Sequence, residues 1–237
     1  MTSDRTILIT GVTGNQGGAV AQALQGSGFR VRGLTRKPES ERAAALARHG
    51  VDVVKGDLDD EATLRRALAG AWGVFGVQNT WEAGVEREEA QGKRLATLAR
   101  EAGVEHYVYT SVGSAHKRTG IPHFDNKWRI EETVRSLRFP SNVILRPVFF
   151  MENLLAPYSL RGDTLSSALG PGTKLQMIAV SDIGWFGARA FTDAAALNRR
   201  EIDIAGDVRT MPEAAEILTD AQAERSVAVA RAATFIR

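Results

Sequence analysis

Short apolar runs alternate with longer amphipathic stretches along the first two thirds of the chain, and this alternation limits the fold more than any other feature. The short runs are rich in β-branched and aromatic residues, which favour strands. They lie at residues 6–10, 30–35, 51–57, 72–78, 106–111 and 142–147. The stretches between them repeat apolar residues every three or four positions, as helices do, at 19–25, 40–50, 61–70, 85–103 and 124–137. Strands joined by crossover helices pair in parallel, so we predict an α/β fold with a doubly wound parallel sheet.

The pattern loosens after Asn153, where residues 156–180 are rich in Gly, Pro and Ser. We therefore predict a doubly wound domain over residues 1–153 and a small, loop-rich portion over 154–237 on the substrate or partner side. This second part is expected to return in part to the sheet. Its expected elements are a helix at 181–197 capped by Ser181, a strand at 200–206 and an Ala-rich terminal helix.

The composition excludes several classes of protein. The chain has 237 residues, 43% of them hydrophobic, which is enough for one large core. The chain has thirty Lys and Arg and twenty-eight Asp and Glu, and these charges are interspersed along it. Neither a nucleic-acid nor a membrane partner is therefore expected. The chain has no Cys, which excludes disulfides and thiolate metal sites. We see neither a signal peptide nor an apolar run long enough for a membrane span, and expect a cytoplasmic protein.

Glycines follow the first predicted strand at a spacing that suits a bound phosphate. Gly11, Gly14 and Gly17 open the helix that begins near Gln16, and Thr13 and Asn15 lie between them. Backbone N–H groups in such a turn can approach a pyrophosphate, and the helix N-terminus favours its negative charge. The alternative is a plain tight turn, for which glycine is also suited. The strand, the helix and the alternating fold around the loop favour dinucleotide binding.

The end of the second predicted strand indicates which dinucleotide is bound. An NAD enzyme commonly places a carboxylate there, against the adenosine ribose. This chain has Arg36 and Lys37 instead, and two cations suit the 2′-phosphate of NADP(H). The alternative is that both are solvated loop cations. Asp57, with Leu58 beside it, ends the third strand and is a candidate acceptor for the adenine amino group, although it could equally cap the next helix.

A set of motifs resembles the NmrA-like family of atypical short-chain dehydrogenases in order and spacing. The motifs are GVTGNQGGAVAQAL, TRKP, KGDLDD, AWGVFGVQNTWE, EAQGKRLATLAREAGVEHYVYTSV, HFDNKWRIEE and LRPVFFMENLL, and the resemblance covers about residues 5 to 215. The resemblance implies a Rossmann fold that binds NADP(H) and, in several members, a regulatory role in sensing the NADPH/NADP balance and binding protein partners. It also implies cofactor contacts from the Gly11–Gly17 loop, Arg36, the Asp57 corner, Gln78, Asn79, Thr80, Lys127, and Phe150 to Asn153.

Two of these groups have a plain chemical reason to contact the cofactor. Gln78, Asn79 and Thr80 end the fourth strand, where they can hydrogen-bond the ribose nearer the nicotinamide. Phe149 and Phe150 end the sixth strand, where they could wall the nicotinamide ring. The alternative for the two aromatic residues is a place in the core.

The usual catalytic pair of short-chain dehydrogenases is incomplete. Such an enzyme pairs a Tyr with a Lys four residues later, which lowers the pKa of the phenol. Here His123 stands four residues before Lys127, and on a helix the two share a face. Lys127 and His123 are the catalytic candidates, although His123 could simply cap or pack the first turn. Ser111 and Ser114 follow the fifth strand, where a substrate-polarising serine is found. The histidines show no metal-ligand spacing, so no metal is predicted.

We therefore favour an NADP(H)-binding, NmrA-like protein that senses redox state or regulates a protein partner. The alternative is an NADPH-dependent oxidoreductase acting on a quinone or a similar small substrate. The complete glycine loop argues against a scaffold that has lost its ligand. Residues 221–237 do not resemble the family, and the chain stops early relative to it, so the cleft is expected to be open or completed by another subunit, as in a homodimer.

Overall fold

A computed structural model describes residues 5–117 and 119–224 of the chain. The residues form two compact units, which are described here one at a time. Among the described residues, the first comprises 5–117, 119–147 and 181–204, and the second comprises 148–180 and 205–224. The first unit therefore ends a few residues before the expected boundary at 153, and the chain re-enters it after the second unit has begun.

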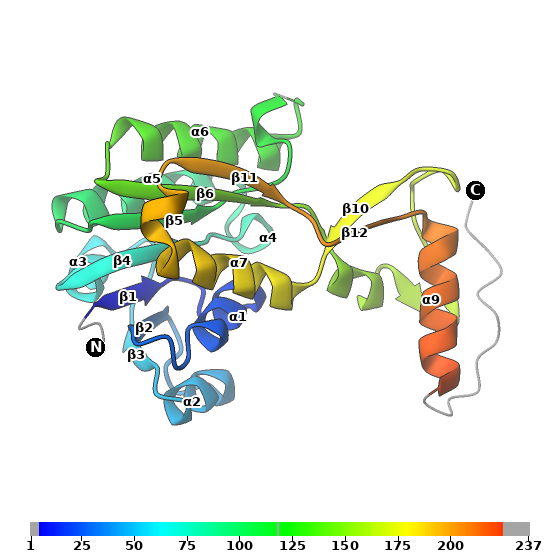
Figure 1. Ribbon diagram of the computed structural model, residues 1–237, viewed down its shortest axis with the longest axis horizontal. Helices are drawn as coiled ribbons and strands as arrows, with labels where there is room; N and C mark the ends of the chain where they lie inside the picture. Colours follow the sequence, from blue (N-terminus) through cyan, green and yellow to red (C-terminus); the bar gives the residue numbers. More distant parts are fainter. Residues whose placement is uncertain (1–4, 118, 225–237) are drawn as a thin grey trace. The chain divides into compact units, whose positions relative to one another are not determined.

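The first unit is built on a seven-stranded sheet in the order β11-β6-β5-β4-β1-β2-β3, in which every neighbouring pair is parallel (Figure 1). The strands are β1 (Thr6–Ile9), β2 (Arg30–Thr35), β3 (Asp52–Lys55), β4 (Ala71–Gly76), β5 (His106–Thr110), β6 (Ser141–Pro147) and β11 (Arg200–Ile204). This order confirms the predicted doubly wound α/β fold. The six strands expected from the alternation are present within two residues of their predicted bounds, and the strand expected near 200–206 adds the seventh.

Helices cover both faces of this sheet (Figure 1). They are α1 (Asn15–Ala23), α2 (Glu41–Arg48), α3 (Glu61–Leu68), α4 (Thr80–Ala83), α5 (Val85–Glu101), α6 (Pro122–Ser136), α7 (Val180–Thr192) and α8 (Ala194–Leu197), with a short 3₁₀ turn at Ala115–Lys117. The predicted helix at 181–197 is thus divided into α7 and α8, because the helix is interrupted at Asp193. Ser181 was predicted as its cap, which is wrong, because α7 begins one residue earlier and Ser181 lies in its first turn.

The two faces of the sheet are packed differently. Helices α3, α5 and α6 bury large apolar side chains against the strands, in one cluster that includes Leu64, Leu95 and Ile130. On the other face α1 and α7 approach each other closely. A Cβ added to Gly184 would lie 2.7 Å from the Ala19 carbonyl oxygen, so this crossing requires a glycine.

The second unit has a small core of its own. A three-stranded sheet pairs β10 (Leu175–Ile178) with β7 (Phe149–Phe150) and β12 (Asp207–Arg209). The remaining elements are a 3₁₀ helix at Met151–Leu155, the short strands β8 (Leu160–Arg161) and β9 (Thr164–Leu165), and α9 (Met211–Glu224). Met177, Leu165 and Met211 form its apolar cluster, with Phe149 packed against it. Much of the expected terminal helix lies outside the described residues.

His106 is the most deeply buried histidine of the described chain. It begins β5 with no exposed surface, and its ring stacks on Trp72 at 5.5 Å between centroids. Nε2 lies 2.9 Å from the Ala190 carbonyl oxygen, and Nδ1 lies 2.8 Å from the Ser141 hydroxyl. Because a carbonyl only accepts, Nε2 carries the proton of a neutral ring. Burial outweighs this hydrogen bond and lowers the pKa of His106 to about 4.

This buried ring predicts an acid-sensitive fold. The unfolded chain binds a proton at His106 near pH 6.5 and the folded chain only near pH 4. Between these values the unfolded state holds more protons, so the free energy of unfolding falls as the pH is lowered through this window, by about 3 kcal/mol for a shift of this size. Urea unfolding at several pH values should show a smaller fall for His106→Gln than for the parent. The exposed His49→Gln should keep the parent slope, and equal slopes for all three would contradict the assignment.

Candidate functional site

The site lies where the strand order reverses in the first unit. Strands β1 and β4 are neighbours, but the chain runs from β1 toward β2 and β3 and from β4 toward β5 and β6. The chain therefore leaves β1 and β4 in opposite directions, the arrangement that forms a crevice at the carboxyl ends of the strands in doubly wound sheets. In doubly wound sheets this crevice is where ligands bind.

The glycine loop fills the β1 side of this crevice. Gly11 has φ +57°, a left-handed conformation that favours glycine. A Cβ on Gly17 would lie 2.4 Å from the Gly11 carbonyl oxygen, so only a glycine lets the helix begin this close to the loop. Gly14 precedes α1 and provides no side-chain cap for its first turn. No side chain of Gly14 therefore occupies the N–H groups of that turn, which an anion could contact, and the phosphate contact stays a prediction.

Two threonine hydroxyls hold the loop in place. Thr10 Oγ1 donates to the Val77 carbonyl oxygen at 2.9 Å and accepts from the Val77 N–H at 2.9 Å, which ties the end of β1 to the loop after β4. Thr110 Oγ1, at the end of β5, donates to Gln16 Oε1 at 2.7 Å. Arg42 also donates to the Thr13 carbonyl oxygen at 3.2 Å. The loop is therefore attached to the segment after β4, to the end of β5 and to α2, attachments that sequence reasoning missed.

Two buried polar side chains next to the crevice have no hydrogen-bond partner among the described residues. Gln78 follows β4, is 6% exposed, and leaves both Nε2 and Oε1 unpaired. Ser111 follows β5, is 4% exposed, and leaves Oγ unpaired. Unpaired buried amide and hydroxyl groups cost about 1–3 kcal/mol each, and such groups call for a polar partner. A ribose or amide group of a bound dinucleotide would supply one.

Arg36 and Lys37 lie in the exposed loop after β2. The Arg36 guanidinium forms an ion pair with Glu82 of α4, and both side chains are about half exposed. The hydrogen bond to Glu82 raises the pKa of Arg36. Lys37 uses its backbone N–H to bind the Thr35 hydroxyl at 3.2 Å. Arg36 is therefore paired with a carboxylate that sequence reasoning missed.

The Asp57 corner is organised by its own hydrogen bonds. Asp57 Oδ1 accepts from the Asp59 N–H at 3.0 Å, whereas the cap of α3 is Asp60, whose side chain accepts from the Thr63 N–H. The alternative role of Asp57 as helix cap is thereby taken by Asp60. Leu58 packs against the large apolar cluster. The adenine contact of Asp57 stays a prediction.

Lys127 and Thr80 meet on one buried carboxylate. Glu88 of α5 is fully buried, and its Oε1 accepts from Lys127 Nζ at 2.5 Å. Oε2 accepts from Asn126 Nδ2 at 2.8 Å and from the Thr80 hydroxyl. Asn79 has another task, because its side chain caps α4 through the Trp81 N–H. Glu88 was missed because its surroundings, EREEAQGKR, are typical of a solvated helix face.

The position of the usual catalytic tyrosine is taken by His123, at the start of α6. Its ring lies 5.3 Å from that of Trp81 and 4.8 Å from that of Phe124, so it packs within an aromatic group. The two tyrosines of β5, Tyr107 and Tyr109, are fully buried, and burial raises the pKa of each phenol. Both phenols are thus enclosed in the core.

Three predicted cofactor residues belong to the second unit. Phe149 and Phe150 form β7, which pairs with Met177 and Ile178 of β10, and Phe149 packs against the small apolar cluster. Phe149 thus lies partly in the core of the second unit, as the alternative to a cofactor contact predicted. Asn153 lies in the 3₁₀ helix that follows. The cofactor contacts of these three residues stay predictions.

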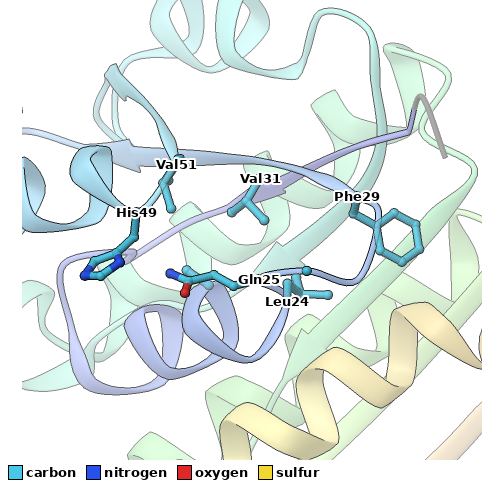
Figure 2. Close-up of a pocket in the computed structure, with 9 residues that line it drawn as sticks. Leu24, Gln25, Phe29, Val31, His49 and Val51 are labelled. Atoms are coloured by element: carbon cyan, nitrogen blue, oxygen red, sulfur yellow. The ribbon is translucent and has the colours of Figure 1, made fainter. Parts of the chain in front are cut away.

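The surface hollow shown in Figure 2 lies away from the carboxyl ends of β1 and β4. The hollow in Figure 2, with a volume of about 160 Å³, lies at the amino ends of β2 and β3. Its lining includes Leu24, Gln25, Phe29, Val31, His49 and Val51. Within residues 5–117 and 119–224, no group of three metal-ligating side chains gathers. No helix of that same part is long and apolar enough to cross a membrane.

The sheet order, the glycine loop at the reversal point and the helix behind it define a Rossmann-type α/β protein. The model of the NmrA-like family matches residues 3–233, and the chain belongs to this family. The match extends past residue 215, so the limit set by the sequence motifs was too short.

Relatives in this family have more than one described role. The NmrA-like oxidoreductase FrzB of Cladobotryum sp is 35% identical over 161 residues, 63% of this chain and 48% of the relative. The chain spans about half the length of the curated relatives it matches first. Among solved structures, an NADPH-dependent quinone oxidoreductase of Escherichia coli, complexed with NADPH, is 28% identical with a TM-score of 0.77, over 92% of this chain and 75% of that one. NmrA, a negative transcriptional regulator in complex with NAD, shares the fold at 20% identity and a TM-score of 0.82, over 99% of this chain and 74% of that one.

The close approach at Gly17 predicts a specific sensitivity. In Gly17→Ala the new methyl group meets two backbone carbonyls, at 2.4 Å and 2.7 Å, which cannot rotate away. We expect the free energy of unfolding to fall by about 1–3 kcal/mol, even though Ala is the better helix former. Gly172→Ala is the control, since no described atom lies within 4 Å of its added Cβ. Urea midpoints measure both, and an unchanged midpoint for Gly17→Ala would refute this account of the loop.

Proposed function

We propose that the chain binds NADP(H) in the crevice outside the carboxyl ends of β1 and β4, and that it senses redox state or regulates a partner. The observation that carries the proposal is the complete glycine loop at the reversal point, next to the unpaired amide of Gln78. The glycines of the loop suit the pyrophosphate, and the first turn of α1 supplies N–H donors. Gln78, Asn79, Thr80 and Lys127 are assigned to the nicotinamide ribose.

The NADP(H) preference rests on the two cations after β2. Arg36 and Lys37 suit a 2′-phosphate, and the residue at the end of β2 is Thr35 rather than a carboxylate. Arg36 has five N–H donors, so a phosphate can bind beside Glu82 or displace it. Solved relatives are complexed with NAD in one case and NADPH in another, which supports a nicotinamide dinucleotide in general.

The regulatory role is favoured by the state of the catalytic candidates. His123 packs against aromatic rings in the place of the usual Tyr, so Lys127 has no phenol four residues before it. When bound, the nicotinamide ring would supply hydride chemistry, but a phenol that exchanges a proton with a substrate oxygen is lacking at this position. A dinucleotide that binds without turnover can report the NADPH/NADP balance.

An oxidoreductase role is the second candidate, because specific relatives favour it. The Cladobotryum relative is named an oxidoreductase, and the Escherichia coli structure is that of an NADPH-dependent quinone oxidoreductase. On this reading Lys127 binds the nicotinamide ribose, and a quinone or similar small molecule accepts the hydride. His123, four residues before Lys127, would be the candidate proton donor.

Replacement of Arg36 tests the cofactor assignment. In Arg36→Ala the loss of a charge-assisted contact should weaken NADPH binding by about tenfold or more and leave NADH binding unchanged. Isothermal titration calorimetry with both nucleotides measures this. Arg48→Ala, an exposed arginine at the end of α2, is the control. Equal losses for the two nucleotides, or none, would contradict the assignment of Arg36 to the 2′-phosphate.

Steady-state turnover separates the two roles. For the sensing role we expect NADPH absorbance to remain constant in the presence of quinones, although NADPH binds. The oxidoreductase role instead predicts continuous oxidation at a rate on the order of 1 per second or faster, lost in Lys127→Ala. Turnover that survives this substitution would refute the role given to Lys127.

A further inference from the structure

Glu88 is a buried charge that links three helices of the first unit. It lies in α5 with no exposed surface, and its two oxygens accept hydrogen bonds from Lys127 and Asn126 of α6 and from Thr80 of α4. Lys127 is itself only 13% exposed. A buried carboxylate costs several kcal/mol unless it is paired and hydrogen-bonded, and a pair of apolar residues would often be as stable. Because burial of this carboxylate is costly in free energy and an apolar pair would often serve folding as well, we look for a functional reason for Glu88.

The partners of Glu88 suggest what that explanation is. Two of them, Lys127 and Thr80, are residues assigned to the nicotinamide half of the dinucleotide. A lysine side chain has four rotatable bonds and three N–H donors, so a single fixed acceptor restricts where its ammonium lies. Glu88 thus restricts both groups through one carboxylate, although it lies in a different helix from each.

The direction of the hydrogen bonds matters for a ribose. Because a carboxylate only accepts, the Thr80 hydroxyl gives its proton to Glu88 and keeps its own lone pairs free to accept. Lys127 spends one N–H on Glu88 and keeps two to donate. A donor and an acceptor held by a common anchor complement the two vicinal hydroxyls of a ribose, each of which can donate and accept.

We propose that Glu88 is a positioning residue that orients Lys127 and Thr80 for the nicotinamide ribose. This inference rests on the proposed function, because it assumes that the crevice binds NADP(H). Glu88 acts through its two partners and does not touch the dinucleotide. Its removal should therefore affect the nicotinamide half of the ligand and spare the adenosine half.

Two nucleotides that differ by the nicotinamide half test this directly. NADPH has both halves, whereas 2′,5′-ADP has the adenosine and the 2′-phosphate alone. In Glu88→Gln we expect NADPH affinity to fall about tenfold, the effect of one weakened charge-assisted contact, and 2′,5′-ADP affinity to stay unchanged. Calorimetry on the full chain measures both. Glu89→Gln is the matched control, because Glu89 is the next residue of α5 and pairs with Lys93 and Arg129 instead.

The outcomes separate the inference from the function on which it rests. If the parent protein binds neither nucleotide, the proposed function fails. If the parent binds both but Glu88→Gln weakens them equally, or weakens neither, the function stands and the positioning role is wrong. If Glu88→Gln does not fold, Thr80→Val and Lys127→Met replace it. Their losses in NADPH affinity should then be non-additive in a double-mutant cycle, and additive losses would overturn the positioning role.

Discussion

The hydroxyl of Thr10 connects the two halves of the main sheet at the point where the site forms. It is buried at the end of β1 and both donates to and accepts from the backbone of Val77, beyond the end of β4. The glycine loop begins one residue after Thr10, and Gln78 follows one residue after Val77. This side chain therefore adds to the pairing of β1 with β4 in setting the position of the loop relative to the amide. A serine could make the same bonds, but without the methyl group that stiffens threonine.

The fold was readable from the sequence because its signals are local. Each of the six predicted strands is a short apolar run, and each is present in the sheet. The glycine loop was readable for the same reason, since its residues are neighbours in sequence. The buried carboxylate was not, because EREEAQGKR has the composition of a solvated face. One signal in the sequence was nevertheless available: a glycine, Gly92, stands four residues after Glu88 and therefore on the same face of α5. In the structure this face packs closely on α6, since a Cβ on Gly92 would lie 2.6 Å from Ile130.

The second unit was harder to predict, because its structure depends on pairing between distant segments. Strand β10 pairs with β7 and with β12, roughly thirty residues away on each side, and β7 has only two residues. Runs this short have no reliable period, and Gly, Pro and Ser between them indicate only turns. The break between α7 and α8 was missed for a related reason, since FTDAAAL keeps good helix formers on both sides of Asp193.

The two cations assigned to the cofactor, Arg36 and Lys127, are both paired with acids of one short segment. Glu82 and Glu88 lie six residues apart, in α4 and the first turns of α5, directly after the strand that forms half of the crevice. The pairs differ in burial. Arg36 and Glu82 are about half exposed, so water and salt weaken their attraction and a phosphate can compete for the guanidinium. Glu88 is fully buried and Lys127 nearly so, and separating them would leave a buried charge without its partner. The adenosine end of the proposed site is therefore adjustable, and the nicotinamide end is held in one arrangement.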